Sequence, residues 1–368
     1  MQNPAAYNLA PAGSILFMGL ILALLPAWWV LKREPTAAGR YRALAVLTLF
    51  LTFDLVVFGA FTRLSDSGLG CPDWPGCYGE SNPLAAHADI SSAQSAMPTG
   101  PVTHGKAWIE MVHRYLATAV GALITLLAAM HAWLRKRRAH GIATSWVPVL
   151  TFVWVCVQGA FGALTVTMKL FPLIVTLHLL GGLGLLALLA VQARGSVAGV
   201  GRERTTRSGK PLPRTWLMAG LAVVVAQAAL GAWVSSNYAV LACNTFPLCQ
   251  GQIWPMMNFA AGFSLWRELG QVAGGGMLPF EALTAIHMVH RIFALLVLVV
   301  FGFVIQRLWR VGAQKSAKWL CALLGLQLLT GLSNVILDWP LVAALLHTGG
   351  AGALVVVLTS LLAEEVAA

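Results

Sequence analysis

The chain has 368 residues, of which 58% are hydrophobic and only 10% are charged, and its mean hydropathy is +0.76. This composition excludes a soluble globular domain and is typical of a polytopic membrane protein in contact with lipid. The formal net charge of +11 does not indicate a nucleic-acid partner, because the basic residues gather in alternate loops between apolar runs and therefore report topology.

Nine apolar runs are long enough to cross a hydrocarbon core. We predict helices for all of them, because lipid cannot hydrogen-bond an open backbone. The first run is interpreted as a retained helix and not as a signal peptide, since Lys32 and Arg33 follow it and no small-residue cleavage site ends it. In chain order the runs cover 13–31, 42–61, 108–134, 146–167, 172–193, 215–234, 283–308, 317–336 and 340–363.

The basic residues between these runs predict how the chain is oriented. Lys and Arg cluster at 32–42, 135–138, 194–214 and 307–318, which all fall on one side of the predicted arrangement. By the positive-inside rule that side is the cytoplasm, and the C-terminus lies there too. The N-terminus and the long loops 62–107 and 235–282 are then outside. We therefore expect an integral protein of the bacterial cytoplasmic (inner) membrane.

The sequence repeats itself. Residues 59–77 and 231–249 align without a gap, IEMVHR at 109–114 returns as IHMVHR at 286–291, and a Gln-x3-Gly pattern followed by a Pro-led run with one His occurs twice. These repeats predict an internal duplication. We expect an all-α fold of two four-helix bundles related by pseudo-twofold symmetry. The expected divisions are an extra N-terminal helix and loop at 1–41, a first bundle at 42–194, a linker at 195–213 and a second bundle at 214–368.

Two cysteine pairs lie in the long outer loops at the same spacing, Cys71 with Cys77 and Cys243 with Cys249. In an oxidising compartment each loop can close a short disulfide ring. The rival interpretation is a zinc site of four thiolates, but the spacing is longer than in usual zinc knuckles and no clustered histidine joins it. Either a structural or a redox role is open to such disulfides.

Four histidines lie inside predicted helices, two in each repeat. With a rise of about 1.5 Å per residue, all four are expected roughly 8–11 Å below the outer surface. Ionisable groups at such positions are costly and usually functional. Two neutral imidazoles that face each other are what axial coordination of haem iron requires. The alternatives are hydrogen-bonded core histidines and discrete metal ions, although the latter would need further ligands that the halves do not offer. The four are His113, His178, His290 and His347.

The repeats differ at one position that matters for chemistry. Glu110 stands three residues before His113, whereas His287 occupies the matching position before His290. A carboxylate one helical turn from a ligand histidine could accept a proton or stabilise positive charge on a substrate. The alternative is a carboxylate near a helix start, where the dipole favours it.

A few cations lie on the outer side beside these histidines, among them Arg63, Arg114 and Arg291. Arg114 and Arg291 directly follow the candidate ligands in the two repeats. Arginine suits bidentate carboxylate binding, so we expect these side chains to bind haem propionates. Snorkelling of single arginines at the membrane interface is the alternative.

Taken together, several motifs resemble the haem A synthase family over about residues 42–363. They are TRLSDSGLGCPDWPGC at 62–77, E-x2-HR at 110–114, the second HR at 290–291, the paired late histidines and the second Cys-x5-Cys. The resemblance implies an oxidoreductase that converts the C8 methyl of haem O to a formyl group, with oxygen expected from water. The product, haem A, serves terminal cytochrome oxidases. The predicted helix at 13–31 lies outside the resemblance.

The resemblance also assigns roles by position. His290 and His347 would hold a haem B cofactor, with its iron, and His113 and His178 would flank the haem O substrate. Glu110 would be the essential acid near the methyl group. The disulfide of Cys71 and Cys77 would be implicated in activity, and that of Cys243 and Cys249 would be its structural counterpart.

Two other functions remain as alternatives, a di-haem b-type electron-transfer cytochrome linked to quinol and a haem carrier. The contrast of Glu110 with His287 favours one catalytic and one cofactor site, because an electron relay would tolerate two like sites. A docked haem O synthase and a homo-oligomer are both compatible with the sequence. The electron acceptor is not indicated by any motif.

Overall fold

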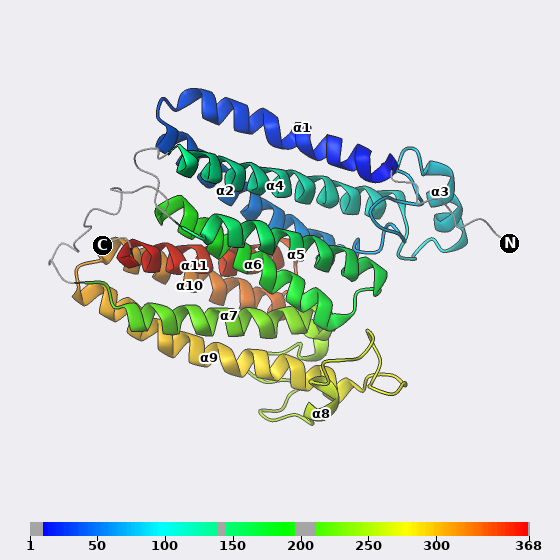
Figure 1. Cartoon of the computed structure of the whole chain (residues 1–368). Helices are drawn as coiled ribbons and strands as arrows, with labels where there is room; N and C mark the ends of the chain where they lie inside the picture. The colour runs from blue at the N-terminus through cyan, green and yellow to red at the C-terminus, as the bar shows by residue number, and fades with distance from the viewer. Residues whose placement is uncertain (1–9, 138–144, 196–210, 367–368) are drawn as a thin grey trace.

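The computed structural model describes residues 10–137, 145–195 and 211–366. Within these ranges it contains eleven α-helices and one short 3-10 helix, and only isolated bridges in place of a sheet. The expected linker at 195–213 lies mostly outside the described residues. The protein is therefore all-helical, as the sequence predicts (Figure 1).

Nine of the described helices are long and apolar enough to cross a membrane, which confirms the predicted spans. Each begins and ends within a few residues of the corresponding apolar run. They are α1 (Ala10–Arg33), α2 (Ala37–Leu64), α4 (His104–Lys136), α5 (Val147–Thr167), α6 (Pro172–Gly195), α7 (Arg214–Ser236), α9 (Phe280–Arg310), α10 (Gln314–Ile336) and α11 (Leu341–Val366).

Polar caps explain why some helices begin before their apolar runs. The Thr36 hydroxyl accepts a hydrogen bond from the backbone N–H of Gly39 at 3.0 Å, and the Thr103 hydroxyl accepts one from that of Lys106 at 3.3 Å. These bonds satisfy donors that a helix start leaves without an intrahelical partner. The helices α2 and α4 thus continue beyond the residues that lipid must cover.

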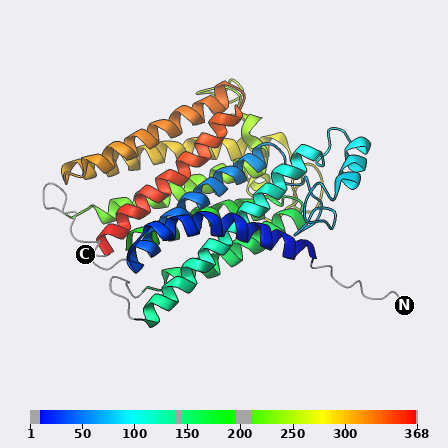
Figure 2. The ribbon, with the colours of Figure 1, turned by 90° about the horizontal axis from the view of Figure 1, so that it is seen from above.

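The long helices contact one another in two sets. In the first, α2 packs on α4 and α6, and α5 packs on α4 and α6; in the second, α7 packs on α9 and α11, and α10 packs on α9 and α11. Contacts of α6 with α7 and α11, and of α2 with α11, join the sets. Figures 1 and 2 show the helices running roughly side by side. Each set has its own cluster of buried apolar side chains.

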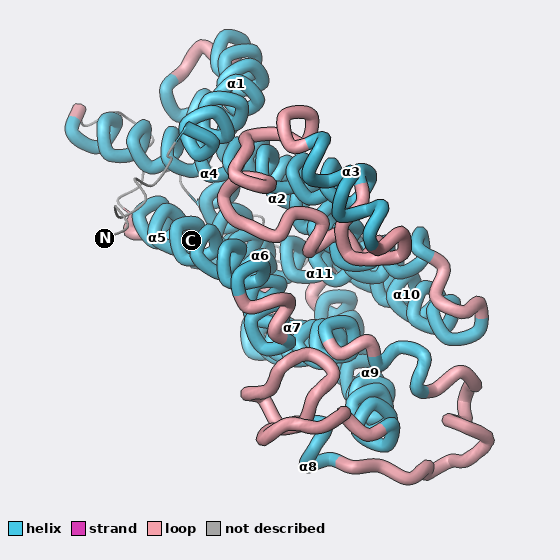
Figure 3. The backbone as a smooth tube through the Cα atoms, turned by 90° about the vertical axis from the view of Figure 1, so that its right-hand side faces the viewer, coloured by secondary structure: helices cyan, strands magenta, loops and turns pink. Residues whose placement is uncertain are grey.

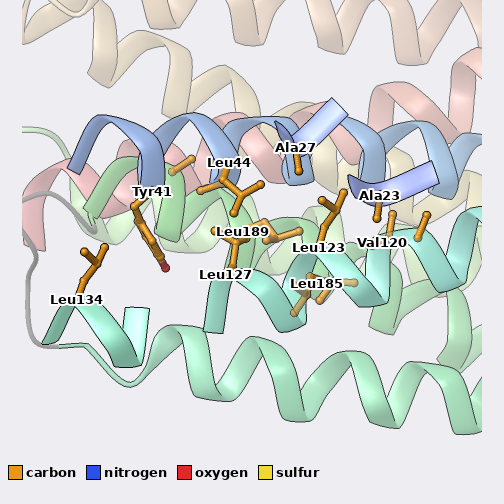
Figure 4. Packing of buried hydrophobic residues seen from close by; sticks show 14 residues of the cluster. Ala23, Ala27, Tyr41, Leu44, Val120, Leu123, Leu127, Leu134, Leu185 and Leu189 are labelled. Carbon is orange, nitrogen blue, oxygen red and sulfur yellow. The ribbon is translucent and has the colours of Figure 1, made fainter. Parts of the chain in front are cut away.

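The first cluster also includes the additional helix α1. Ala23 and Ala27 are buried against side chains of α4 such as Val120 and Leu123, as Figure 4 shows. A Cβ built on Gly19 would lie 2.5 Å from Cγ2 of Thr118, so only glycine permits this close approach of α1 to α4. The predicted extra helix is therefore an integral part of the packed structure.

Both long loops lie at the same end of the helices (Figures 1 and 3). They contain three short helices that the sequence analysis did not predict, α3 (His87–Ala96), the 3-10 helix η1 (Ala239–Ala242) and α8 (Phe259–Gly262). The two cysteine pairs are in these loops, and the candidate histidines are on the helices that the loops connect.

Candidate functional site

Each of the four candidate histidines packs its ring against a glycine of a neighbouring helix. A Cβ built on any of these glycines would lie close to the histidine Cε1, so the glycines make room for the imidazoles. The arrangement recurs in both halves of the chain with matching residues. The pairs are Gly59 of α2 with His113 of α4 (3.0 Å), Gly162 of α5 with His178 of α6 (3.6 Å), Gly231 of α7 with His290 of α9 (3.0 Å) and Gly331 of α10 with His347 of α11 (3.4 Å).

In the second half, the rings of His290 and His347 face each other. Their centroids are 6.5 Å apart and their planes are inclined by 78°. A glutamine side chain from the adjacent helix anchors the backbone at each histidine. Gln227 Nε2 donates to the carbonyl of His290 at 3.1 Å, and Gln327 Nε2 donates to that of His347 at 3.0 Å. The glutamines thereby fix the helix turn that presents each ring.

In the first half, His113 and His178 lie near enough to interact electrostatically. The Phe58 ring lies almost parallel to that of His113, with centroids 6.2 Å apart and planes inclined by 11°. Both histidine rings are partly buried, and the Nδ1 atom of each is buried without a hydrogen-bond partner among the described residues. Nδ1 of His290 is in the same situation. Such atoms are unusual in a packed core, and both ring nitrogens of His131 are also without a partner among the described residues.

Glu110 lies at the centre of a buried polar network in the first half. Its side chain is almost fully buried, with Oε2 accepting the backbone N–H of Cys71 at 2.8 Å and Oε1 forming an ion pair with Arg114 at 2.5 Å. Arg114 also donates to the carbonyls of Pro75, at 3.1 Å, and of Gly76. The carboxylate is thus held between α4 and the loop that carries the first disulfide.

The matching network in the second half has no carboxylate. Arg291 Nε lies 3.2 Å from His287 Nε2 and donates to it. The other guanidinium nitrogens of Arg291 donate to loop carbonyls, those of Cys243 at 2.6 Å and Thr245 at 2.9 Å. The arginine therefore connects helix and loop in both halves, but its partner on the helix is negatively charged only in the first.

The structure joins Cys71 to Cys77 and Cys243 to Cys249, the pairs expected from the sequence, with Cα–Cα distances of 4.9 and 4.6 Å. All four cysteines are fully buried. The first disulfide packs with Ile15 of α1 and Met111 of α4. Each loop is therefore closed and covered next to its histidine-bearing helix.

Arg63 connects the two halves at the end of α2. Its Nη2 donates to the carbonyl of Ser235 at 2.5 Å, and its guanidinium lies 3.9 Å from the ring centroid of Tyr238. The Tyr238 hydroxyl donates to Asp66 at 2.7 Å. Burial raises the pKa of Tyr238 from its ordinary value of 10.0. The predicted propionate-binding role of Arg63, Arg114 and Arg291 stays a prediction, and all three donate to protein acceptors here.

The side chains available as metal ligands restrict which groups these two sites can hold. Among the described residues, no three His, Cys, Asp or Glu side chains gather as ligands for a metal ion. Two facing imidazoles instead suit an iron that already has four equatorial nitrogens from a macrocycle. Fold and site together define a polytopic helical membrane protein with two histidine-paired sites beneath disulfide-closed loops.

A family model described as cytochrome oxidase assembly protein matches residues 42–359, and the chain belongs to this family. Helix α1 precedes the matched region. A protein of Shewanella oneidensis named haem A synthase is 37% identical over 86% of this chain and 93% of its own length. Proteins of the same name from Caulobacter vibrioides and Halalkalibacterium halodurans are 29% and 26% identical, over 84% and 83% of this chain and 91% and 92% of their own lengths. These matches confirm the resemblance seen in the motifs.

Proposed function

We propose that this protein is a haem A synthase, an oxidoreductase that converts the C8 methyl group of haem O to a formyl group. The names of its relatives support this assignment and do not favour the alternatives, a quinol-linked di-haem cytochrome or a haem carrier. The single observation in the structure that carries the proposal is the unequal pair of sites. Both have two histidines near each other, but only the first has a buried carboxylate one turn away.

The first half is assigned to the substrate. His113 and His178 would flank haem O, and their unpartnered Nδ1 atoms and the glycines against their rings support a site for a flat ring system. Glu110 is oriented by the protein itself, because the Cys71 N–H and the Arg114 guanidinium fix its two oxygens. In this position it would accept protons or stabilise positive charge during oxidation of the methyl group.

The second half is assigned to a haem B cofactor held by His290 and His347. The two rings, with centroids 6.5 Å apart, would hold the haem iron between them. When bound, this haem would supply one-electron redox chemistry. The contribution of the chain is to hold the two rings, through Gly231, Gly331 and the glutamines that bond the histidine carbonyls.

The architecture follows from the same assignment. The repeated contacts and glycine–histidine pairs support two four-helix bundles, 42–194 and 214–368, related by pseudo-twofold symmetry and preceded by the extra helix. The two loops at one end of the helices support an arrangement with both disulfides outside the bacterial inner membrane and the C-terminus in the cytoplasm. A haem O synthase and a second copy of the chain are candidate partners.

Co-expression with a source of haem O tests the function. Chromatography of extracted porphyrins is expected to reveal haem A only when the protein is present. A variant with His113→Ala and His178→Ala serves as the matched control, because it keeps the second-half site and should yield haem O alone. Bound b-type haem without haem A in the parental protein would favour the electron-transfer cytochrome instead.

A further inference from the structure

A cavity lies between the two sets of helices. It has a volume of about 530 Å³ and is lined by α2 on one side and by α10 and α11 on the other. Almost all of its lining is apolar, with Val57 of α2, Leu326 of α10 and Leu346 of α11 among the contributors. The volume is within the range of about 300–1,000 Å³ typical of small-molecule sites. An apolar molecule, or the apolar part of one, would fit it.

One ionisable residue lines this cavity. Asp54 is the sole acidic residue of the second apolar run; it lies near the middle of α2 in the sequence, and its side chain is exposed. No hydrogen bond or ion pair joins it to another side chain in the part of the chain that is described. A carboxyl group at such a position is costly and usually serves function. The occupant of the cavity is therefore expected to bring a hydrogen-bond donor to Asp54.

The cavity and the first-half site share one side chain. Phe58 lies one turn after Asp54 on α2 and lines the cavity, and its ring is also the one stacked beside His113 at 6.2 Å. Phe58 is therefore a neighbour of His113 and a wall of the cavity at once. This shared residue favours a group attached to the substrate over a free lipid of the membrane as the occupant of the cavity.

We propose that the cavity binds the isoprenoid tail of haem O, with Asp54 accepting a hydrogen bond from the hydroxyl group at the root of that tail. The inference rests on the proposed function. Haem O carries a hydroxyethylfarnesyl group where haem B carries a vinyl group, so its tail is a long apolar chain with one hydroxyl next to the ring. Cavity and Asp54 match those two parts. They make the first-half site selective for haem O over haem B.

Two substitutions separate the parts of this site. Ala353→Phe would fill the cavity from α11, and Asp54→Ala would remove the hydrogen-bond acceptor while leaving the apolar lining in place. Gly350 is avoided, because a side chain there would collide with Gln327, which bonds the backbone of His347. Val342→Phe is the matched control, since Val342 is on the same helix, is 68% exposed and lies outside the cavity.

The test is a spectroscopic titration of the full-length purified protein, with haem B already in the second half, using haem O and haem B in turn. The parental protein and Val342→Phe are expected to bind haem O more tightly than haem B. Ala353→Phe and Asp54→Ala should each weaken haem O binding by at least about tenfold and leave haem B binding unchanged.

Other outcomes would overturn the inference in distinct ways. Equal weakening of both haems would mean a general packing defect, and no weakening of either would place the tail elsewhere. Unchanged haem O affinity with slower turnover, relieved by added quinone, would assign the cavity to a membrane quinone. Haem A production by the parental protein is scored separately, so failure of the tail site and failure of the proposed function give different results.

Discussion

The two halves use the same local design with one change of charge. In both, an arginine directly after a partly buried histidine extends to carbonyls of the disulfide-closed loop. In the first half its helix partner is Glu110, and the ion pair has no net charge; in the second half the partner is His287, and the arginine keeps its positive charge. A duplicated scaffold has thus produced two different electrostatic environments at equivalent positions.

This difference explains how one fold can provide two roles. A carboxylate next to a flat substrate favours any step in which positive charge develops close to it, even where an arginine on its other side balances its net charge. A cation in the equivalent place favours the opposite sign and suits a bound group that carries carboxylates. The helices and glycines are alike in both halves, so the chemistry depends on a few side chains near the loops.

The largest expected effect concerns the second-half histidines. We expect His290→Ala and His347→Ala each to remove the low-spin b-type haem signal from the purified protein, because one axial ligand is lost. His113→Ala should retain that signal, since it alters the other half. Optical spectra of the variants provide the measurement. An unchanged spectrum in both second-half variants would refute the pairing.

The next effect concerns stability. Arg114→Met would leave the buried Glu110 carboxylate without its partner, so we expect a loss of about 3–5 kcal/mol in the free energy of unfolding. Arg291→Met would leave only neutral acceptors, and a loss of about 1–3 kcal/mol is expected. Denaturation midpoints in one detergent would compare them. Equal losses would show that the charge of the helix partner does not matter.

A smaller effect is expected on the reaction itself. Glu110→Gln keeps the size of the side chain but removes its charge and one of its two acceptor oxygens, so haem A formation should fall about a hundredfold, which corresponds to ~3 kcal/mol. The second-half haem spectrum should persist. His287→Gln is the matched control and should remain active. If Glu110→Gln makes haem A at the parental rate with the same pH dependence, the catalytic assignment is wrong.

The smallest effect concerns the contact between the halves. Tyr238→Phe removes the hydrogen bond to Asp66 and should cost about 0.5–1.5 kcal/mol. The pKa of Tyr238 is raised by burial, so the folded state retains its proton to higher pH than the unfolded state. Stability should therefore fall as the pH rises above 10.0, and less steeply in the Phe variant. Identical pH profiles would exclude this contribution.

The sequence predicts the long helices well because hydropathy is a local property. All nine spans were identified within a few residues of their ends. The short helices α3 and α8 were missed, since they lie in loops of mixed composition where tertiary contacts decide the conformation. The bundle symmetry and domain limits stay predictions.

Parts of the candidate site were visible in the sequence but were interpreted differently. Glu110 and Arg114 are four residues apart on a helix, a spacing that allows an ion pair, yet Arg114 was assigned to propionates. Asp54 lies within an apolar run but was not among the candidate residues. The contact of Gly59 with His113 joins α2 to α4. No local sequence pattern predicts which sides of two helices will pack against each other.

The position of α1 has a consequence for the order of events in biogenesis. Ile15 packs on the Cys71–Cys77 disulfide, and a Cβ on the neighbouring Gly76 would lie 3.4 Å from Pro11. A thiol oxidant must approach the sulfur atoms directly to form such a bond. Since both cysteines are fully buried in the folded protein, we expect the pair to be oxidised before α1 packs on α4. Helix α1 precedes the loop in the chain but would then take its final place after the loop has closed.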